Sequence, residues 1–228
     1  MSSLASYIDH TILKPTTSHI EINKICKEAL EYGFAAVCVP PPFVVLAKSS
    51  GVRVATVIGF PFGYSVSAAK LAEVERALAD GADELDVVIN LVVLKAGDWG
   101  RLEAEMRVLA GQIHDAGRLV KVIIESGVLT DEEIIRCCAL YGGLGVDFLK
   151  TSTGYAEKGA TVEAVRLMRA HLPSTVRIKA SGGIRTYALA RQLIDAGADR
   201  LGCSASVEIV NGEVAAGGRG EAAGGGGY

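Results

Sequence analysis

Eight short apolar segments recur along the chain, and helical patterns lie between most of them. The strand-like segments are residues 7–10, 35–39, 53–58, 84–89, 119–125, 146–150, 176–181 and 200–203. The clearest helical segments are residues 18–32, 67–80, 101–116, 131–140, 161–171 and 186–196. Because strands that alternate with helices form parallel sheets, eight such units in 228 residues predict an α/β fold, a single-domain (β/α)8 barrel. An open doubly wound sheet is the alternative, but no Gly-x-Gly-x-x-Gly motif follows the first strand.

Residues that commonly mark helix ends flank several of the helical segments. Ser18 lies three residues before Glu21, and Thr130 lies three residues before Glu133, so both pairs match the capping box. Glycine, which readily adopts the left-handed conformation at a helix C-terminus, ends other segments, as at Gly33. These signals predict compact helices joined to strands by short loops.

The composition is typical of a soluble globular protein, with 50% hydrophobic and 21% charged residues. The formal net charge is -3 and no basic cluster occurs, which disfavours nucleic acid and anionic membranes as partners. Neither a membrane-length apolar stretch nor a signal-peptide pattern is present. We therefore expect a cytoplasmic protein that binds small molecules, with no membrane and no nucleic acid among its partners.

The five cysteines do not have the spacing of a metal site or of a redox pair. This pattern predicts a reduced compartment and no metal, with the cysteines acting as small hydrophobic core residues. Cys38 and Cys203 each end a strand-like segment, so reachable thiols are the alternative for these two.

Charged residues occupy one face of several strand-like segments. Side chains along a strand alternate between its two faces, so Asp86 lies on the face opposite to Leu85 and Val87. We expect the polar face of each strand to point into the barrel, at or below the C-terminal mouth where barrel enzymes carry out their chemistry. The residues expected there are Asp86, Lys121, Glu125, Lys150, Arg177 and Lys179.

Lys150 and Lys179 lie on neighbouring predicted strands, which suggests amine chemistry. Ammonium groups roughly 5 Å apart, at an effective dielectric constant of about 20, repel by about 3 kcal/mol, or roughly two pKa units. A lysine made neutral in this way can attack a carbonyl to form a Schiff base. Alternatively, charges of opposite sign neutralise one another and fix the strand register. The spacing does not decide which lysine is the nucleophile.

Glycine-containing loops follow the last two predicted strands. Glycine lets the backbone approach a ligand closely, and backbone N–H groups at the start of a helix bind anions. Barrels that act on phosphorylated sugars commonly bind phosphate in these two loops, although paired glycines also serve as simple turns. The candidate phosphate-binding residues are Gly182, Gly183, Ile184, Arg185, Gly202 and Ser204.

Three motifs, in this order, resemble those of the 2-deoxyribose-5-phosphate aldolases: LDVVIN around Asp86, KTSTG from Lys150 and KASGGIR from Lys179. The resemblance extends from IDHTILKP at Ile8 to GCSAS at Gly202. It implies a class I aldolase on a (β/α)8 barrel that needs no cofactor and no metal. It also implies a homo-oligomer, a dimer or tetramer, that cleaves a phosphorylated sugar into aldehydes in the catabolism of deoxyribose phosphate from deoxynucleosides.

The resemblance also implies roles for individual residues. Lys150 forms the Schiff base, Lys179 lowers the pKa of Lys150, and Asp86 acts with water in proton transfer. Thr153 and Gly154 join the substrate-binding set, and Asp9 is a possible auxiliary residue. The GCSAS segment departs from the more usual Gly-Thr-Ser-Ser because Cys203 and Ala205 lack hydroxyl groups, but the backbone donors remain.

The glycine-rich C-terminus is expected to lie outside the barrel. Residues 1–211 would form the barrel, and residues 212–228 a flexible tail that cannot bury apolar surface. Tyr228 could then reach the barrel mouth and join a proton relay, or the tail could have no function.

Two other functions are compatible with the same residues. A sugar-phosphate isomerase of the barrel class would use carboxylates as acid and base without covalent attachment. A non-catalytic sugar-phosphate binding protein would keep the glycine loops but would leave the paired lysines without a role. Reductive trapping of a substrate on lysine separates an aldolase from both.

Overall fold

The structure, a computed structural model, describes residues 3–221 and forms a closed barrel of parallel strands. The strands follow one another around the barrel in chain order, and β8 pairs with β1 to close it. Their bounds are β1 (Ile8–Thr11), β2 (Ala36–Val39), β3 (Val54–Ile58), β4 (Glu84–Val88), β5 (Leu119–Ile123), β6 (Phe148–Lys150), β7 (Arg177–Ser181) and β8 (Arg200–Cys203). The predicted (β/α)8 barrel is confirmed, and the open sheet is wrong.

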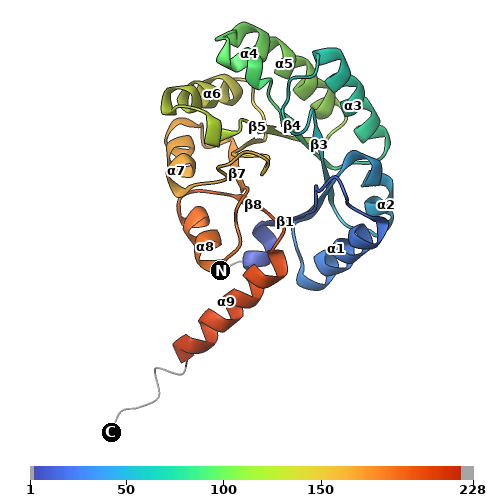
Figure 1. Cartoon of the computed structure of the whole chain (residues 1–228), viewed down its shortest axis with the longest axis vertical. Helices are drawn as coiled ribbons and strands as arrows, with labels where there is room; N and C mark the ends of the chain where they lie inside the picture. Colours follow the sequence, from blue (N-terminus) through green and yellow to red (C-terminus); the bar gives the residue numbers. More distant parts are fainter. Residues whose placement is uncertain (1–2, 222–228) are drawn as a thin grey trace.

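Helices surround the barrel as an outer ring (Figure 1). They are α1 (His19–Tyr32), α2 (Val44–Ser49), α3 (Ser67–Ala79), α4 (Leu91–Lys95), α5 (Trp99–Asp115), α6 (Asp131–Gly143), α7 (Val162–His171), α8 (Tyr187–Asp195) and α9 (Ser206–Glu221). Three 3-10 helices accompany them within residues 3–221: η1 (Leu4–Tyr7), η2 (Pro41–Phe43) and η3 (Ser126–Val128). The sequence patterns missed α2 and α4, because segments of six and five residues are too short to show a helical period. None of the helices in the described part of the chain has the length and apolar character of a membrane span.

The expected helix ends are present. Ser18 and Thr130 form complete capping boxes with Glu21 and Glu133, so side chains satisfy backbone N–H groups at the starts of α1 and α6. Gly33 ends α1 with a φ of 69°, in the left-handed region that favours glycine.

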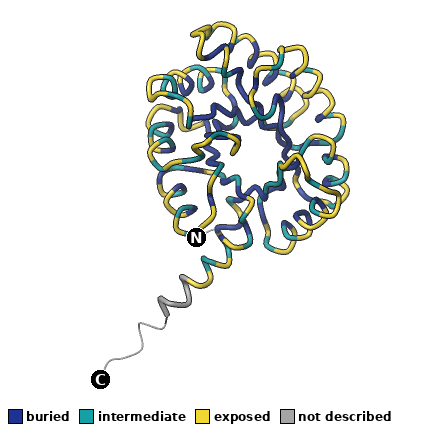
Figure 2. Tube along the Cα trace, viewed as in Figure 1, coloured by how far each residue is buried: buried dark blue, intermediate teal, exposed yellow. Residues whose placement is uncertain are grey.

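Along each strand, alternate side chains pack against the surrounding helices or point into the barrel. Leu85 and Val87 of β4 pack in the main hydrophobic core between the barrel and its helices, where nearly every strand residue is buried (Figure 2). Asp86, between them, points the other way, into the barrel. The register places Asp86 beside Lys121 and Lys150 beside Lys179, so the predicted alternation brings charged side chains together inside the barrel.

The C-terminal segment differs from the expectation of a tail that begins at residue 212. Helix α9 extends to Glu221 and projects from the barrel near the N-terminus (Figure 1). Gly212 is a packing residue, because a Cβ there would lie 2.9 Å from Tyr187 Cβ of α8. Contact with α8 and the burial of Ile209 favour the helix despite the cost of about 1 kcal/mol for each glycine. Residues 222–228, including Tyr228, lie outside the described residues.

Candidate active site

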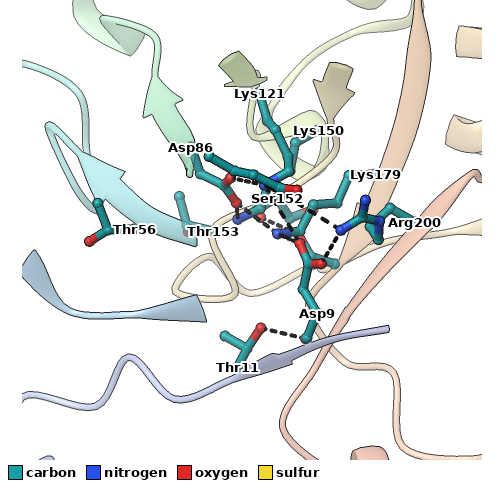
Figure 3. Close-up of polar contacts among 12 residues, drawn as sticks. Asp9, Thr11, Thr56, Asp86, Lys121, Lys150, Ser152, Thr153, Lys179 and Arg200 are labelled. Carbon is teal, nitrogen blue, oxygen red and sulfur yellow. Dashed lines mark hydrogen bonds and ion pairs between the residues drawn. The ribbon is translucent and has the colours of Figure 1, made fainter. Parts of the chain in front are cut away.

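A cluster of ion pairs fills the centre of the barrel (Figure 3). Its members are almost fully buried, and each comes from a strand whose polar face points inward. The acidic members are Asp9, Glu84 and Asp86, and the basic members are Lys121, Lys150, Lys179 and Arg200. Charged groups at this depth are tolerated because each has a partner of opposite sign.

Asp86 is the centre of this cluster and binds three lysines. Its Oδ1 accepts a hydrogen bond from Lys121 Nζ at 2.7 Å. Its Oδ2 accepts from Lys150 Nζ at 2.7 Å and from Lys179 Nζ at 2.8 Å. Burial alone would raise the pKa of Asp86, but the three lysines outweigh it and hold the pKa well below its usual range. Asp86 is therefore a carboxylate.

Lys179 is held as an ammonium group. Burial disfavours its charge, but Asp86 and Asp9 together raise the pKa of Lys179 well above its usual value. Its Nζ donates to Asp9 Oδ2 at 2.5 Å in addition to Asp86. A lysine with two carboxylate partners is a poor nucleophile, so the structure separates its role from that of Lys150.

Lys150 is the lysine of the cluster whose pKa is lowered. Burial is the largest cause, Asp86 opposes it, and Lys179 lowers the pKa further. The sequence predicts repulsion by Lys179, and in the structure this repulsion lowers the pKa of Lys150 less than desolvation does. Both ammonium groups bond Asp86 Oδ2, so they are close enough to repel each other strongly.

The charge balance of the cluster also favours a neutral Lys150. The three carboxylates named above face four basic groups, so one basic group has no anion to balance its charge. Lys121 contacts both Glu84 and Asp86, and although burial is the largest effect and lowers its pKa, these carboxylates and Asp9 together raise it. Arg200 Nη1 donates to Asp9 at 2.6 Å and stays charged. Lys150, with Asp86 as its ion-pair partner, loses its proton at the lowest cost.

Sequence reasoning missed two members of the cluster. Glu84 lies two residues before Asp86, on the same face, and Arg200 begins β8; strand alternation could have indicated both. Lys121 Nζ lies 2.6 Å from Glu84 Oε2, although this oxygen has no well-aligned hydrogen bond. Arg177, expected at or below the mouth, lies below it, because it begins β7 and stacks on Phe148 with 4.0 Å between its guanidinium carbon and the ring centroid.

Glu125 takes a different position from the one that strand alternation predicts. β5 ends at Ile123, and Glu125 has a φ of 54°, which is uncommon for a residue other than glycine. Its buried carboxylate accepts hydrogen bonds from Thr153 N and Thr153 Oγ1. Glu125 therefore supports the loop that follows Lys150 and does not join the central cluster.

A second buried ion pair fixes the end of β4 behind Asp86. Lys70 of α3 is fully buried, and its Nζ donates to Val88 O at 2.9 Å and to Glu105 Oε1 of α5 at 2.6 Å. These contacts tie the strand that carries Asp86 to the two helices outside it.

A cavity of about 210 Å³ opens above Lys150 at the C-terminal mouth. All eight residues expected to bind substrate or phosphate line it: Thr153, Gly154, Gly182, Gly183, Ile184, Arg185, Gly202 and Ser204. Thr11 and Ser181 of the neighbouring strands add hydroxyl groups. The cavity therefore connects an amine of lowered pKa with backbone and hydroxyl donors suited to an anion.

Two glycines of this cavity differ in their surroundings: one faces open space and the other is closely packed. Gly183 has a φ of 78°, and a Cβ there would point into open space, so its backbone is accessible to a ligand. Gly202 is a packing glycine instead, because a Cβ there would lie 2.8 Å from Ser181 Cβ and 3.2 Å from Lys179 Cε.

The close approach of Gly202 to Lys179 leads to a prediction. Gly202→Ala should displace Lys179 and lower turnover by about 10- to 100-fold, because displacements of about 1 Å in a catalytic site have effects of that size. Steady-state kinetics measures the turnover number of this variant. Gly111→Ala is the control, since a Cβ at this position of α5 contacts nothing within 4 Å, and its turnover should equal that of the wild type.

The five cysteines are all free and buried. Burial raises the pKa of Cys203 to about 12 and also raises the pKa of Cys38, so neither forms a thiolate readily. The interpretation of the cysteines as core residues is confirmed, and the alternative of reachable thiols is wrong.

Comparison with known proteins places the chain in a family. Residues 3–217 match the family described as DeoC/LacD family aldolase. The chain is 49% identical to the deoxyribose-phosphate aldolase of Thermococcus gammatolerans over 215 residues, which cover 92% of this chain and 96% of the relative. It is 48% identical to the deoxyribose-phosphate aldolase of Clostridium kluyveri over 212 residues, covering 91% and 97% of the two chains.

Solved structures agree with the sequence comparison. An aldolase called QR15 superposes with a TM-score of 0.89 at 38% identity, over 94% of this chain and 97% of the other. The deoxyribose phosphate aldolase of Aeropyrum pernix, described as tetrameric, superposes with a TM-score of 0.86 at 33% identity, over 93% and 92% of the two chains. Together with the lysine of lowered pKa at the barrel mouth, these matches show that the chain belongs to the DeoC/LacD family of aldolases.

Proposed function

We propose that this aldolase reversibly cleaves 2-deoxy-D-ribose 5-phosphate to D-glyceraldehyde 3-phosphate and acetaldehyde through a Schiff base on Lys150. The observation that carries the proposal is that Lys150 lines the substrate cavity and has a lowered pKa, whereas the pKa values of Lys121 and Lys179 are raised. Its relatives from Thermococcus gammatolerans and Clostridium kluyveri carry the corresponding name.

The reaction begins with attack of the neutral Lys150 amine on C1 of the open-chain aldehyde. The carbinolamine takes up a proton and loses water, which leaves an iminium ion. Removal of the proton from the C3 hydroxyl forms a carbonyl at C3 and breaks the C2–C3 bond, and the electron pair moves into an enamine. Protonation at C2 and hydrolysis of the iminium then release acetaldehyde and a proton and restore the amine.

The charged cluster supports these steps in two ways. Lys179, as an ammonium group close to Lys150, keeps the attacking amine neutral. Asp86 is a weak base because three lysines bind it, so we assign it to orienting Lys150, Lys179 and a water molecule that carries the proton. Asp9 is a positioning residue that holds Lys179 and Arg200.

Incubation with 2-deoxy-D-ribose 5-phosphate tests the reaction directly. NMR should show acetaldehyde and D-glyceraldehyde 3-phosphate forming in equal amounts. A product with five carbons would instead indicate an isomerase, and unchanged substrate would indicate a binding protein.

The phosphate should bind to the glycine loops, so unphosphorylated deoxyribose should be a much poorer substrate. Binding energy from a remote phosphate can be used to position the reacting carbons. Gly183→Val should remove most of this preference, because its side chain would enter the open space above residue 183. The measurement is the ratio of kcat/KM for the two sugars. Equal rates on both sugars in the wild type would place the phosphate elsewhere.

We further propose that the protein acts in the cytoplasm as a homo-oligomer. The free cysteines fit a reduced compartment, and the relative from Aeropyrum pernix is described as tetrameric. Light scattering coupled to size-exclusion chromatography would give the number of subunits. A role for Tyr228 in proton transfer remains a proposal.

A further inference from the structure

The loop between β6 and α7, residues 151–161, packs directly against the phosphate loop, residues 182–185, which follows β7. A Cβ atom on Gly159 would lie 2.2 Å from Gly182 O and 2.5 Å from Gly182 C, and both of these are backbone atoms. A Cβ atom on Gly182 would lie 3.1 Å from Gly159 Cα and 3.3 Å from Gly154 Cα. The two loops are therefore in contact through their backbones, and position 159 has no room for a side chain.

Hydrogen bonds hold the two loops together. The Ala160 N–H donates to Ser181 O and to Gly182 O, at 3.0 Å in both cases. At the start of the β6–α7 loop, the Ser181 N–H donates to Thr151 Oγ1 at 3.1 Å, and the Thr151 hydroxyl donates to Ser181 O at 3.2 Å. The end of β7 is thus bonded to both ends of the β6–α7 loop.

These contacts set the direction of one amide group in the phosphate loop. Gly182 O and Gly183 N belong to a single trans peptide unit, and in a planar trans peptide the C=O and the N–H point in opposite directions. Because Gly182 O faces Ala160, which does not line the substrate cavity, the Gly183 N–H faces the other way. Among residues 3–221, no backbone carbonyl accepts a hydrogen bond from this N–H, so it is available to an anion.

The β6–α7 loop has no space to move away from Gly182. On its other side lies η3, where a Cβ atom on Gly127 would be 2.4 Å from Lys158 O and 2.9 Å from Lys158 Cβ. The backbone of Gly159 does not itself require glycine, because its φ is not positive. A methyl group at position 159 would therefore act by steric contact, and it would displace the peptide between Gly182 and Gly183.

We infer that Gly159 is a positioning residue that directs the Gly183 N–H toward the phosphate of the substrate. This inference rests on the proposed function, in which the phosphate binds to the glycine loops. Gly159 acts through Gly182 and does not line the substrate cavity, so it controls phosphate binding without contact to the sugar. The amine chemistry should be independent of this contact, because Lys150 and its partner Asp86 lie on β6 and β4.

The test compares the phosphorylated and the unphosphorylated sugar in Gly159→Ala. The ratio of kcat/KM for 2-deoxy-D-ribose 5-phosphate to that for 2-deoxy-D-ribose should fall about 10- to 100-fold, the size of effect that a displacement of about 1 Å has at a site. The inhibition constant of inorganic phosphate should rise about tenfold or more, because a hydrogen bond to a charged group is weakened. The rate of imine formation between acetaldehyde and Lys150 should equal that of the wild type.

Two further variants make the result specific. Gly127→Ala would press on Lys158 from the side of η3, and it should lower the same ratio by a smaller factor, because the displacement reaches Gly182 through the loop. Gly143→Ala is the matched control, since it adds a methyl group at an exposed position of α6 with nothing within 4 Å. Its ratio should equal that of the wild type. The melting temperature shows whether each variant is folded.

An unchanged ratio in Gly159→Ala would overturn the inference, and so would an equal loss of rate on both sugars, which would indicate general damage to the barrel. If Gly159→Ala does not fold, the ratio in Gly127→Ala decides in the same way. A wild type that is not trapped on Lys150, or that has no preference for the phosphorylated sugar, would contradict the proposed function and the inference with it. Trapping and preference in the wild type, with an unchanged ratio in the variants, would contradict the role of Gly159 alone.

Discussion

Borohydride reduction in the presence of acetaldehyde should attach a two-carbon group to Lys150 and leave Lys121 and Lys179 unmodified. Borohydride also reduces free acetaldehyde, but only reduction of an imine leaves the two carbons attached to the lysine, and an imine forms only from a neutral amine that the aldehyde can reach. Lys150 meets both requirements, since it lines the cavity and burial lowers its pKa. Lys179 does not, because Asp9 and Asp86 both raise its pKa.

Lys150→Ala should abolish the labelling and lower turnover by about 10⁴-fold or more, the scale seen when a covalent nucleophile is removed. The protein should remain folded. Without Lys150, the cluster has three carboxylates and the three basic groups Lys121, Lys179 and Arg200, so no buried charge lacks a partner. Peptide mapping by mass spectrometry locates the label, and the melting temperature reports folding. A label on Lys179, or none in the wild type, would contradict the assignment of the nucleophile.

The architecture followed from local patterns, because each strand could be identified from its own residues. An apolar run bounded by turn residues indicates a strand wherever it occurs, and eight such runs alternating with helices have few solutions other than a closed barrel. Alternation along β4 and β5 placed Asp86 and Lys121 on the inner face, and the observed register pairs them. Local rules were sufficient here because all strands are parallel and share one polar interior.

The energetics of the site could not be obtained in the same way. The pKa of Lys150 depends on desolvation and on how many carboxylates each lysine contacts, which are properties of the closed barrel. Glu84 and Arg200 complete the charge balance only because β1, β4, β5 and β8 meet inside it. The hydrogen bond from the Tyr155 hydroxyl to Leu13 O joins residues 142 positions apart, and no periodicity in the sequence predicts it.

Replacement of Lys179 tests the role of charge in activating Lys150. Lys179→Leu removes a cation that lowers the pKa of Lys150, while Asp86, which raises it, stays. The pKa of Lys150 should therefore rise, and its neutral fraction should fall about tenfold for each unit of pH below the new value. We expect a large loss of kcat/KM near neutral pH and an optimum displaced to higher pH. The rate of imine formation with acetaldehyde should show the same displacement.

The single variant leaves three carboxylates facing the three basic groups Lys121, Lys150 and Arg200, so the cluster is balanced only while Lys150 keeps its charge. A double variant separates this charge effect from the loss of the side chain at position 179. Adding Asp9→Asn removes one carboxylate, so that Glu84 and Asp86 again face one more basic group than they can balance: Lys121, Lys150 and Arg200. The pH optimum should therefore return toward that of the wild type. If the pH optimum of the double variant equals that of Lys179→Leu, then the shape of the side chain at position 179 determines the pKa of Lys150, and the charge-balance explanation is wrong.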